Sequence, residues 1–147
     1  MNRELWSLLE ASFPGQDDRF FTPIFIGGTS SAANEGAVAI LSGRKTTTSS
    51  PFWDYPDGRI PFPGALSILL DGQERPVGIV ETQRVEVMPF NSAKEDFALS
   101  YGEWDLTLET WRIETRAWYE ASAARHGQTF SDDTPIICEW FAVVRRF

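Results

Sequence analysis

The stretch from Ala65 to Phe90, ALSILLDGQERPVGIVETQRVEVMPF, decides the fold because it predicts two neighbouring strands. Its first half is an apolar run, and its second half alternates valine with charged residues over Arg84–Val87. A period of two residues is typical of a strand that buries one face. Asp71 and Gly72 separate the two runs and are expected to form the turn of an antiparallel hairpin.

The segments around this hairpin predict helices and two more strands. The expected elements are a helix over 5–13, a helix capped by Ser30 or Ser31 that ends near Leu41, a strand over 45–50, a short helix opened by a capping box of Ser92 and Glu95, a helix over 106–125 and a closing strand over 135–147. This order lacks the regular strand–helix alternation of a parallel sheet. We therefore expect an α+β fold with a mainly antiparallel, barrel-like sheet and surrounding helices, in one domain over 1–147.

Several large side chains within these elements are expected in the core. Phe97 and Leu99 are assigned to the inner side of the short helix. Trp111 and Trp118 fall on the apolar stripe of the long helix, and Trp140 lies in the closing strand. Helical and strand spacing favour packing over ligand binding for these residues.

Composition restricts the classes of partner. The 147 residues carry a net charge of -8, which argues against long duplex DNA or other long nucleic acid, because such binding depends on many contacts from lysine and arginine to phosphates. No run approaches the ~20 apolar residues of a membrane span, so a soluble cytoplasmic protein is expected. One cysteine and one histidine leave no usual metal motif, and we expect neither metal nor cofactor.

The segment SGRKTTTSS over 42–50 superficially resembles a phosphate-binding loop. Arg44 separates Gly43 from Lys45, however, and a helix precedes the segment where a phosphate-binding loop would follow a strand. The segment is better explained as a helix end with Gly43 at the C′ position, followed by a strand. Binding of a nucleoside triphosphate through this loop is therefore excluded.

Four blocks along the chain point to a known family. They are Gly43 and Lys45 with the hydroxyl-rich strand, VGIVETQRVEVMPFN over 77–91, YGEWDLTLETWR over 101–112, and IICEWFAVV over 136–144. With these four blocks in this order, the chain resembles the ASCH domain family from about Phe25 to the C-terminus, and its first helix is an N-terminal extension. The resemblance implies a PUA-like barrel with helices around a cleft, and RNA or nucleoside ligands. One branch of the family hydrolyses the acetyl amide of N4-acetylcytidine, and another has been linked to RNA cleavage.

The resemblance also implies catalytic residues. The lysine, threonine and glutamate of the amidohydrolase branch correspond to Lys45, Thr48 and Glu103, as base, nucleophile and acid–base group. The chain departs from its relatives at Gly28, where an aspartate is frequent, and at Thr115, near the place of a histidine.

Other residues are candidates for ligand binding. Trp53 and Tyr55 could stack on a base or close the end of the barrel. Glu81 could bond a base edge or pair with a surface cation such as Arg84. The remaining two candidates are Asp105, which lies beside Glu103 and before the long helix, and Arg112, which could bind phosphate or pair with a neighbouring glutamate.

Three functions remain open at this level. The first is metal-free hydrolysis of an acylated nucleobase such as N4-acetylcytidine. The second is noncatalytic binding of a short RNA or modified nucleoside through Lys45, Arg112 and aromatic stacking. The third is ribonuclease activity by clustered carboxylates, which the acidic net charge disfavours.

Overall fold

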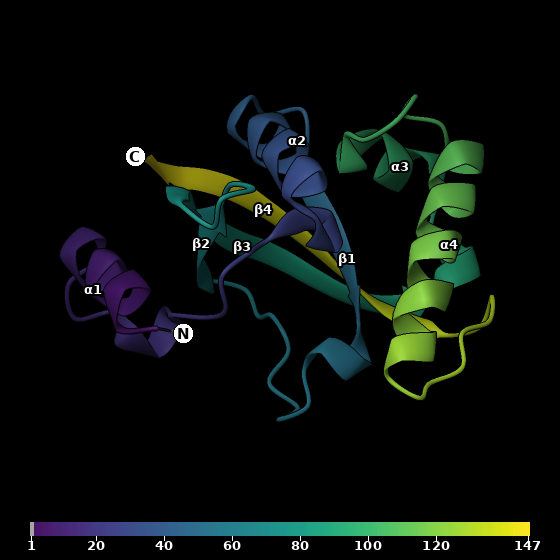
Figure 1. Ribbon diagram of the computed structural model, residues 1–147, viewed down its shortest axis with the longest axis horizontal. Coiled ribbons are helices and arrows are strands. Elements are labelled where there is room, and N and C mark those ends of the chain that lie inside the picture. The colour runs from purple at the N-terminus through teal and green to yellow at the C-terminus, as the bar shows by residue number, and fades with distance from the viewer. Residues whose placement is uncertain (1) are drawn as a thin grey trace.

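The structure, a computed structural model, describes residues 2–147. Its helices are α1 (Arg3–Ser12), α2 (Ser30–Leu41), α3 (Glu95–Tyr101) and α4 (Leu108–Arg125), and its strands are β1 (Thr47–Pro51), β2 (Leu66–Leu70), β3 (Pro76–Pro89) and β4 (Pro135–Arg146). Four short 3-10 turns connect them: η1 (Asp17–Arg19), η2 (Ile26–Gly28), η3 (Phe52–Asp54) and η4 (Phe90–Ser92). Figure 1 shows α1 at one end of the sheet and α4 at the other.

The four strands form one antiparallel sheet in the order β1-β4-β3-β2. The register between β3 and β4 shifts at Ile79/Val80 and again at Thr82/Arg84. Such irregularities bend a strand and increase its twist, so the two long strands curl. The segment 20–24 then runs parallel to the free edge of β2, through bridges at Phe20–Leu66 and Ile24–Leu69. The result is a curled half-barrel, and the α+β prediction is confirmed.

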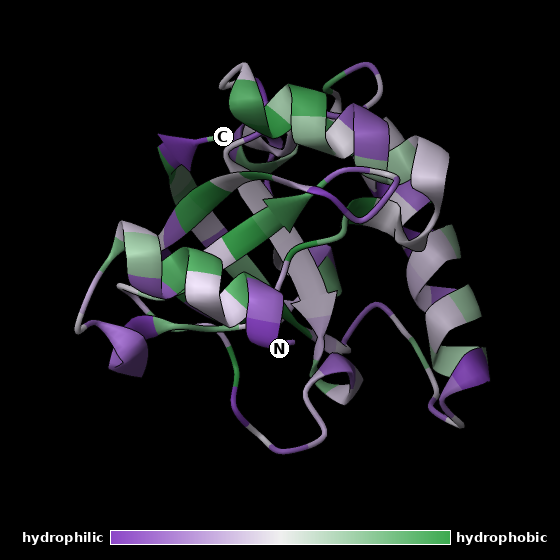
Figure 2. Cartoon of the chain, turned by 60° about the vertical axis from the view of Figure 1, so that its left-hand side comes forward, coloured by the Kyte–Doolittle hydropathy of each residue, from purple (hydrophilic) through white to green (hydrophobic). Residues whose placement is uncertain are grey.

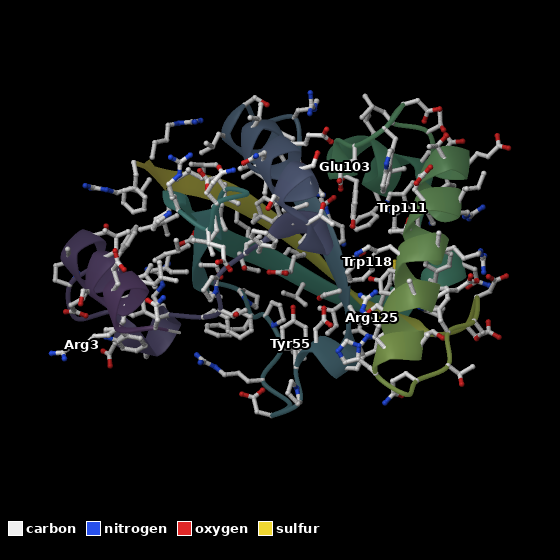
Figure 3. The ribbon with its side chains drawn as sticks, viewed as in Figure 1. Arg3, Tyr55, Glu103, Trp111, Trp118 and Arg125 are labelled. Atoms are coloured by element: carbon white, nitrogen blue, oxygen red, sulfur yellow. The ribbon has the colours of Figure 1, made fainter. Side chains whose placement is uncertain are left out.

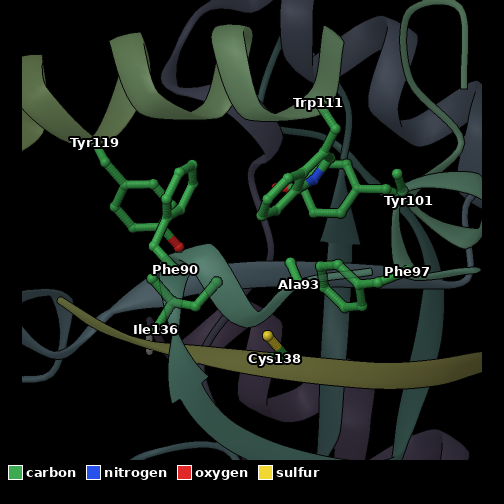
Figure 4. Packing of buried hydrophobic residues seen from close by; sticks show 9 residues of the cluster. Phe90, Ala93, Phe97, Tyr101, Trp111, Tyr119, Ile136 and Cys138 are labelled. Carbon is green, nitrogen blue, oxygen red and sulfur yellow. The ribbon is translucent and has the colours of Figure 1, made fainter. Parts of the chain in front are cut away.

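The apolar residues form three clusters around this sheet. The largest lies under α3 and α4 and is aromatic, with Trp111 stacked on Phe90 and in edge contact with Phe97 (Figure 4). A second joins α1 to β2, and a third joins α2 to the middle of the sheet. Figure 2 shows hydrophobic residues in the central strands and hydrophilic residues in the loops. Trp111 is buried as expected, whereas Trp118 and Trp140 are only partly buried at the border of the aromatic cluster.

Three local predictions were wrong. Helix α2 is capped by Thr29, whose hydroxyl accepts from the backbone N–H of Ala32, because the helix already begins at Ser30. The capping box does not form, since Ser92 lies in η4 and the cap position of α3 is Lys94, without a side-chain bond.

Leu99 is the third. It is 60% exposed, because the seven-residue helix α3 turns Phe97, Ala98 and Tyr101 inward and thereby places Leu99 on the opposite side. The hairpin, the long helix and the closing strand form where their sequence patterns predict them.

Candidate functional site

A cavity of about 300 Å³ opens beside β1 and β4. Its walls come from the segment before α2, from β1 and η3, from β2 and β4, and from the α3–α4 connection and α4. The lining residues are Phe21, Thr22, Pro23, Ile24, Phe25, Ile26, Gly27, Thr48, Ser49, Ser50, Asp54, Tyr55, Ser67, Tyr101, Glu103, Trp104, Thr115, Trp118 and Glu139. Figure 3 labels Tyr55, Glu103 and Trp118, which reach this region from three different segments.

Lys45 and Glu103 form an ion pair at this cavity. The Lys45 Nζ lies 2.9 Å from Glu103 Oε2 and donates to the backbone oxygen of Tyr101 at 3.1 Å. Lys45 is 1% exposed, whereas the side chain of Glu103 keeps 26% of its surface. Burial lowers the pKa of Lys45 to about 8, and the charge and hydrogen bond of Glu103 oppose that shift. The amine is therefore far easier to deprotonate than an exposed lysine.

Two glycines position this lysine. Gly43 follows α2 with φ +81° and turns the chain toward β1. Gly102 follows α3 with φ +69°, and a Cβ there would lie only 2.4 Å from the backbone oxygen of Arg44. The backbone around Lys45 can therefore approach the end of α3 only because residue 102 has no side chain. The bond from the Thr46 N–H to the Ser100 oxygen holds the two segments together at 2.9 Å.

Tyr101 connects Lys45 to the cavity. The Lys45 Nζ lies 3.4 Å from the centre of the Tyr101 ring, and the Tyr101 hydroxyl lies 3.3 Å from the Ser49 hydroxyl. Burial, together with the charge of Glu103, raises the pKa of Tyr101, while hydrogen bonding to Ser49 and Thr48 opposes the shift. Tyr101 is therefore a neutral phenol that touches both the ion pair and the hydroxyl-rich strand.

Thr48 lies on β1 and lines the cavity beside Glu139, its partner in the register with β4. Lys45 does not itself line the cavity, and within residues 2–147 no hydrogen bond joins it to Thr48. The structure thus brings Lys45 and Glu103 into direct contact, and it places Thr48 and Glu103 in one cavity.

Glu139 lies on the floor of the cavity and is only 6% exposed. The Thr82 hydroxyl donates to its Oε1 at 3.0 Å. Burial raises the pKa of Glu139 from 4.5 to about 7, and the Thr82 hydrogen bond opposes the shift. A substantial fraction of this carboxyl is therefore protonated at neutral pH.

The other predicted ligand-binding residues divide into two groups. Tyr55 lines the cavity and shares a hydrogen bond with Ser50 at 2.9 Å. The remaining four lie outside the lining: Trp53 donates to the Ser122 hydroxyl at 2.9 Å, Glu81 pairs with Arg19, Asp105 accepts from Thr107 and Thr110 at the start of α4, and Arg112 donates to the backbone oxygens of Asn91 and Ala93.

The sequence patterns missed several lining residues. Tyr101 and Ser67 carry no local signal, because each lies in an apolar segment typical of a core. Glu139 does carry one, since a carboxylate inside the apolar run PIICEWF signals a buried polar group. Trp118, assigned to the core, packs at the border of the aromatic cluster and also lines the cavity.

The mouth of the cavity has unusual backbone. Trp104 and Leu106 have φ values of +56° and +69°, a region that side-chain-bearing residues rarely adopt. Trp104 is 47% exposed and lies stacked on Tyr101 with ring centres 6.2 Å apart. Strain of this kind is frequent at functional sites, and here it holds an exposed indole at the cavity entrance.

Comparisons with known proteins identify the family of this chain. The family model described as "ASCH domain" matches residues 22–145. The chain belongs to the ASCH domain family. This ASCH protein resembles the crystal structure of an ASCH domain from Lactobacillus crispatus JV V101, with 27% identity, a TM-score of 0.83, and coverage of 97% of this chain and 92% of that one. Its fold is therefore PUA-like, as expected, a fold associated with RNA binding.

Two further structures are similar. A protein from Enterococcus faecalis V583 shares 28% identity with a TM-score of 0.83 over 98% of this chain and 95% of that one. The hypothetical protein PH0355, at 13% identity, shares the fold alone, with a TM-score of 0.54 over 85% of this chain and 98% of that one. No curated protein matches the ASCH chain.

Neither a metal-binding cluster nor a membrane-spanning helix is present within residues 2–147. No cluster of three or more histidine, cysteine, aspartate or glutamate side chains is arranged to bind a metal ion. Each helix in this part of the chain is too short or too polar to cross a bilayer. Cys138 is free and buried, and burial raises its pKa to about 12, which gives an unreactive thiol.

Proposed function

We propose that this ASCH protein binds a modified nucleoside in the cavity and hydrolyses an acylated nucleobase amide, such as that of N4-acetylcytidine, in the cytoplasm. The carrying observation is the ion pair between the buried Lys45 and the partly exposed Glu103, which lines a cavity together with Thr48. The proposal requires no metal or cofactor, because lysine, threonine and glutamate together supply a base, a nucleophile and an acid.

The shape and charge of the cavity support a nucleoside as the ligand. A volume of about 300 Å³ is at the lower end of small-molecule sites, which run from roughly 300 to 1,000 Å³. Aromatic side chains on the walls, among them Tyr55, Trp104 and Trp118, offer faces for a base. The lining contains three carboxylates and neither lysine nor arginine, which favours an uncharged nucleoside over a nucleotide phosphate.

The proposed reaction proceeds through an acyl-enzyme. The Thr48 hydroxyl oxygen attacks the acyl carbonyl carbon, and its proton passes to the neutral amine of Lys45, directly or through water. The bond from the carbonyl carbon to the exocyclic nitrogen breaks, and that nitrogen receives a proton from the Lys45–Glu103 pair. Water then hydrolyses the Thr48 ester and releases the carboxylic acid.

The test is release of cytidine and acetate from N4-acetylcytidine. Thr48→Ala should lower kcat/KM by at least about a hundredfold, while Thr46→Ala, an exposed threonine two residues earlier, should keep the wild-type rate. Because Lys45 acts as a base with a pKa of about 8, the wild-type rate should rise with pH up to that value. Full activity in Thr48→Ala would refute the mechanism.

A second candidate is binding without turnover, and one observation favours it. Within residues 2–147 no hydrogen bond joins Lys45 to Thr48, so the nucleophile is not activated in the arrangement seen. In this candidate, Arg112 does not bind phosphate, because its guanidinium already donates to the backbone oxygens of Asn91 and Ala93. A nucleoside or short RNA that shifts the melting temperature, with no product formed, would support this function.

A further inference from the structure

Glu139 has hydrogen-bonding capacity that the protein does not use. Its Oε1 accepts from Thr82, but no group within residues 2–147 donates to its Oε2, and no lysine, arginine or histidine there lies within ion-pair distance. The only fully buried polar side-chain atoms without a partner in this part of the chain are Nε1 of Trp111 and Nε of Arg112. Oε2 of Glu139 therefore keeps some accessible surface, and Glu139 lines the cavity.

Several other polar groups of the lining are already bonded within the protein. Glu103 binds Lys45, Tyr55 binds Ser50, Ser49 binds Tyr119, and Thr115 binds a backbone oxygen of its own helix. The carboxyl of a residue as buried as Glu139, with no cation beside it, is costly unless a hydrogen-bond partner satisfies it. The free oxygen of Glu139 is therefore available to a ligand in the cavity.

We infer that Glu139 is the specificity residue of the cavity and hydrogen-bonds the edge of a cytosine-type base, in which a ring-nitrogen acceptor lies beside an exocyclic N–H. This inference deepens the proposed function, on which it rests, because it assigns recognition of the base to a residue outside the reacting set. Ser67, a buried hydroxyl on β2 without a hydrogen bond within residues 2–147, is a second free polar group on the same lining.

The protonated carboxyl matches this edge. A neutral carboxyl carries one O–H donor and keeps acceptor capacity on its other oxygen. Since Thr82 donates to Oε1 and no group in residues 2–147 donates to Oε2, a proton carried on Oε2 can be donated to the ring nitrogen. The exocyclic N–H then finds an acceptor in the same carboxyl. With a pKa of about 7, Glu139 loses this donor as the pH rises above neutrality.

Other ionisable groups face the same cavity and must be separated from Glu139. Those in the lining are Asp54 from η3, Tyr55 after it, Tyr101 from α3 and Glu103 after α3. Lys45 lies behind Tyr101, and the charges of His126 and Arg125 at the end of α4 act on Asp54. The segment 21–27 and the lining residues of α4, Thr115 and Trp118, contribute no ionisable side chain. Burial raises the pKa of Asp54, so Asp54→Asn is the matched control for a second lining carboxyl.

The experiment is calorimetric binding of cytidine and uridine at about pH 6 and about pH 8.5. Each pH unit above the pKa of about 7 removes a factor of about ten in the protonated form, so the affinity for cytidine should fall by tenfold or more. Uridine should lose less, because an ionised carboxylate still accepts from its ring N–H. The preference for cytidine should therefore decline as the pH rises.

Glu139→Gln separates this role from a structural one. Glutamine presents an N–H donor and a carbonyl acceptor at every pH, so its affinity for cytidine should be equal at both pH values. Asp54→Asn should retain the wild-type decline. Thermal unfolding verifies that both variants fold. The dependence of the wild-type cytidine affinity on pH is a test that needs no variant.

Four outcomes would overturn the inference: no cytidine binding, a pH-independent wild-type affinity, an affinity that rises with pH, or the same decline in Glu139→Gln. Turnover of N4-acetylcytidine in the same samples distinguishes this failure from failure of the proposed function. If N4-acetylcytidine is turned over and the pH profile is the same in Glu139→Gln, then Glu139 does not recognise the base, but the proposed hydrolase function stands. If the affinity of the wild type for cytidine falls as the pH rises and no turnover occurs, the result supports Glu139 as the base-recognition residue of a noncatalytic binding protein.

Discussion

The aromatic cluster under α4 and the neighbouring cavity share Tyr101 and border on Trp118, yet burial serves different purposes in the two regions. In the cluster, Trp111 is buried among Phe90, Phe97 and Tyr101 even though its indole N–H has no partner. Apolar contact outweighs the lost hydrogen bond there. In the cavity and just behind its wall, burial instead changes the chemistry of Glu139 and Lys45 by shifting each pKa toward neutrality.

The comparison teaches that one wall can serve both stability and chemistry. Tyr101 packs against Trp111 (Figure 4). The ring of Tyr101 also lies against the Lys45 amine. The cluster provides the rigid support that a low-dielectric site requires, because residues on rigid elements hold their geometry more closely than residues on mobile loops. Substitutions in the cluster should therefore affect stability first, and substitutions in the cavity should affect pH dependence first.

The largest expected effect comes from Trp111→Ala. Removing a fully buried indole should lower the free energy of unfolding by roughly 3–5 kcal/mol, because it leaves a cavity among the stacked rings. Trp104→Ala removes an exposed indole and should change stability by less than about 0.5 kcal/mol, while weakening binding of a base at the cavity mouth. Urea denaturation compares the two. Equal losses of stability would contradict the division between the two regions.

Gly102→Ala should have the next largest effect, about 2–4 kcal/mol. A left-handed conformation costs an alanine about 1–2 kcal/mol, and the new Cβ would also collide with the Arg44 oxygen. Gly58→Ala is the matched control, since Gly58 has φ +77° but no atom within 4 Å of the added Cβ. The difference between the two free energies of unfolding isolates the collision. If this difference is zero, the contact between residue 102 and the Arg44 backbone is not close enough to position Lys45.

The pH dependence of stability should reveal Glu139. Its pKa rises from 4.5 in the unfolded chain to about 7 in the folded protein, so the folded state binds more protons between these values. The resulting stability is complete below about pH 4.5 and is lost as the pH rises through about 7, by up to about 3 kcal/mol. Glu139→Gln should abolish this loss in denaturation experiments over that range. An unchanged slope in the variant would assign the dependence to another group.

The smallest effect is expected at Leu99. Although it lies one residue from the buried Ala98, its side chain is 60% exposed, so Leu99→Glu should alter the free energy of unfolding by less than about 0.5 kcal/mol. Phe97→Ala, on the inner side of the same helix, should cost several times more. Chemical denaturation of the two variants decides whether the cluster ends at this face of α3.

The elements of the fold were largely predictable because their signals are local. The Asp71–Gly72 turn, the apolar stripe of α4 and the apolar run that ends the chain each specify an element within a short window. Cap positions were less predictable. Ser92 and Glu95 satisfy the spacing of a capping box, but the chain forms a 3-10 turn at Ser92, and its backbone is no longer placed to cap α3.

The site was less predictable because its contacts join distant segments. Lys45 and Glu103 are 58 residues apart, and no periodicity within the chain relates them. Their pairing as candidates came from resemblance to the ASCH family. Glu81, Asp105 and Arg112 were also candidate ligand-binding residues in the sequence, but none of them lines the cavity. Their partners are Arg19, the hydroxyls of Thr107 and Thr110, and the backbone oxygens of Asn91 and Ala93, respectively.

The sequence by itself determined the order of helices and strands, the antiparallel pairing of its central hairpin and the resemblance to ASCH domains, because hydrophobic period and turn chemistry act over a few residues. Only the tertiary structure decided which polar groups are deprived of water and which receive a partner. Lys45 and Glu139 are both buried ionisable residues, yet only Lys45 has a counter-ion within the described chain. Desolvation and pairing depend on the entire surrounding fold, so no local pattern could distinguish the paired group from the one directed at a ligand.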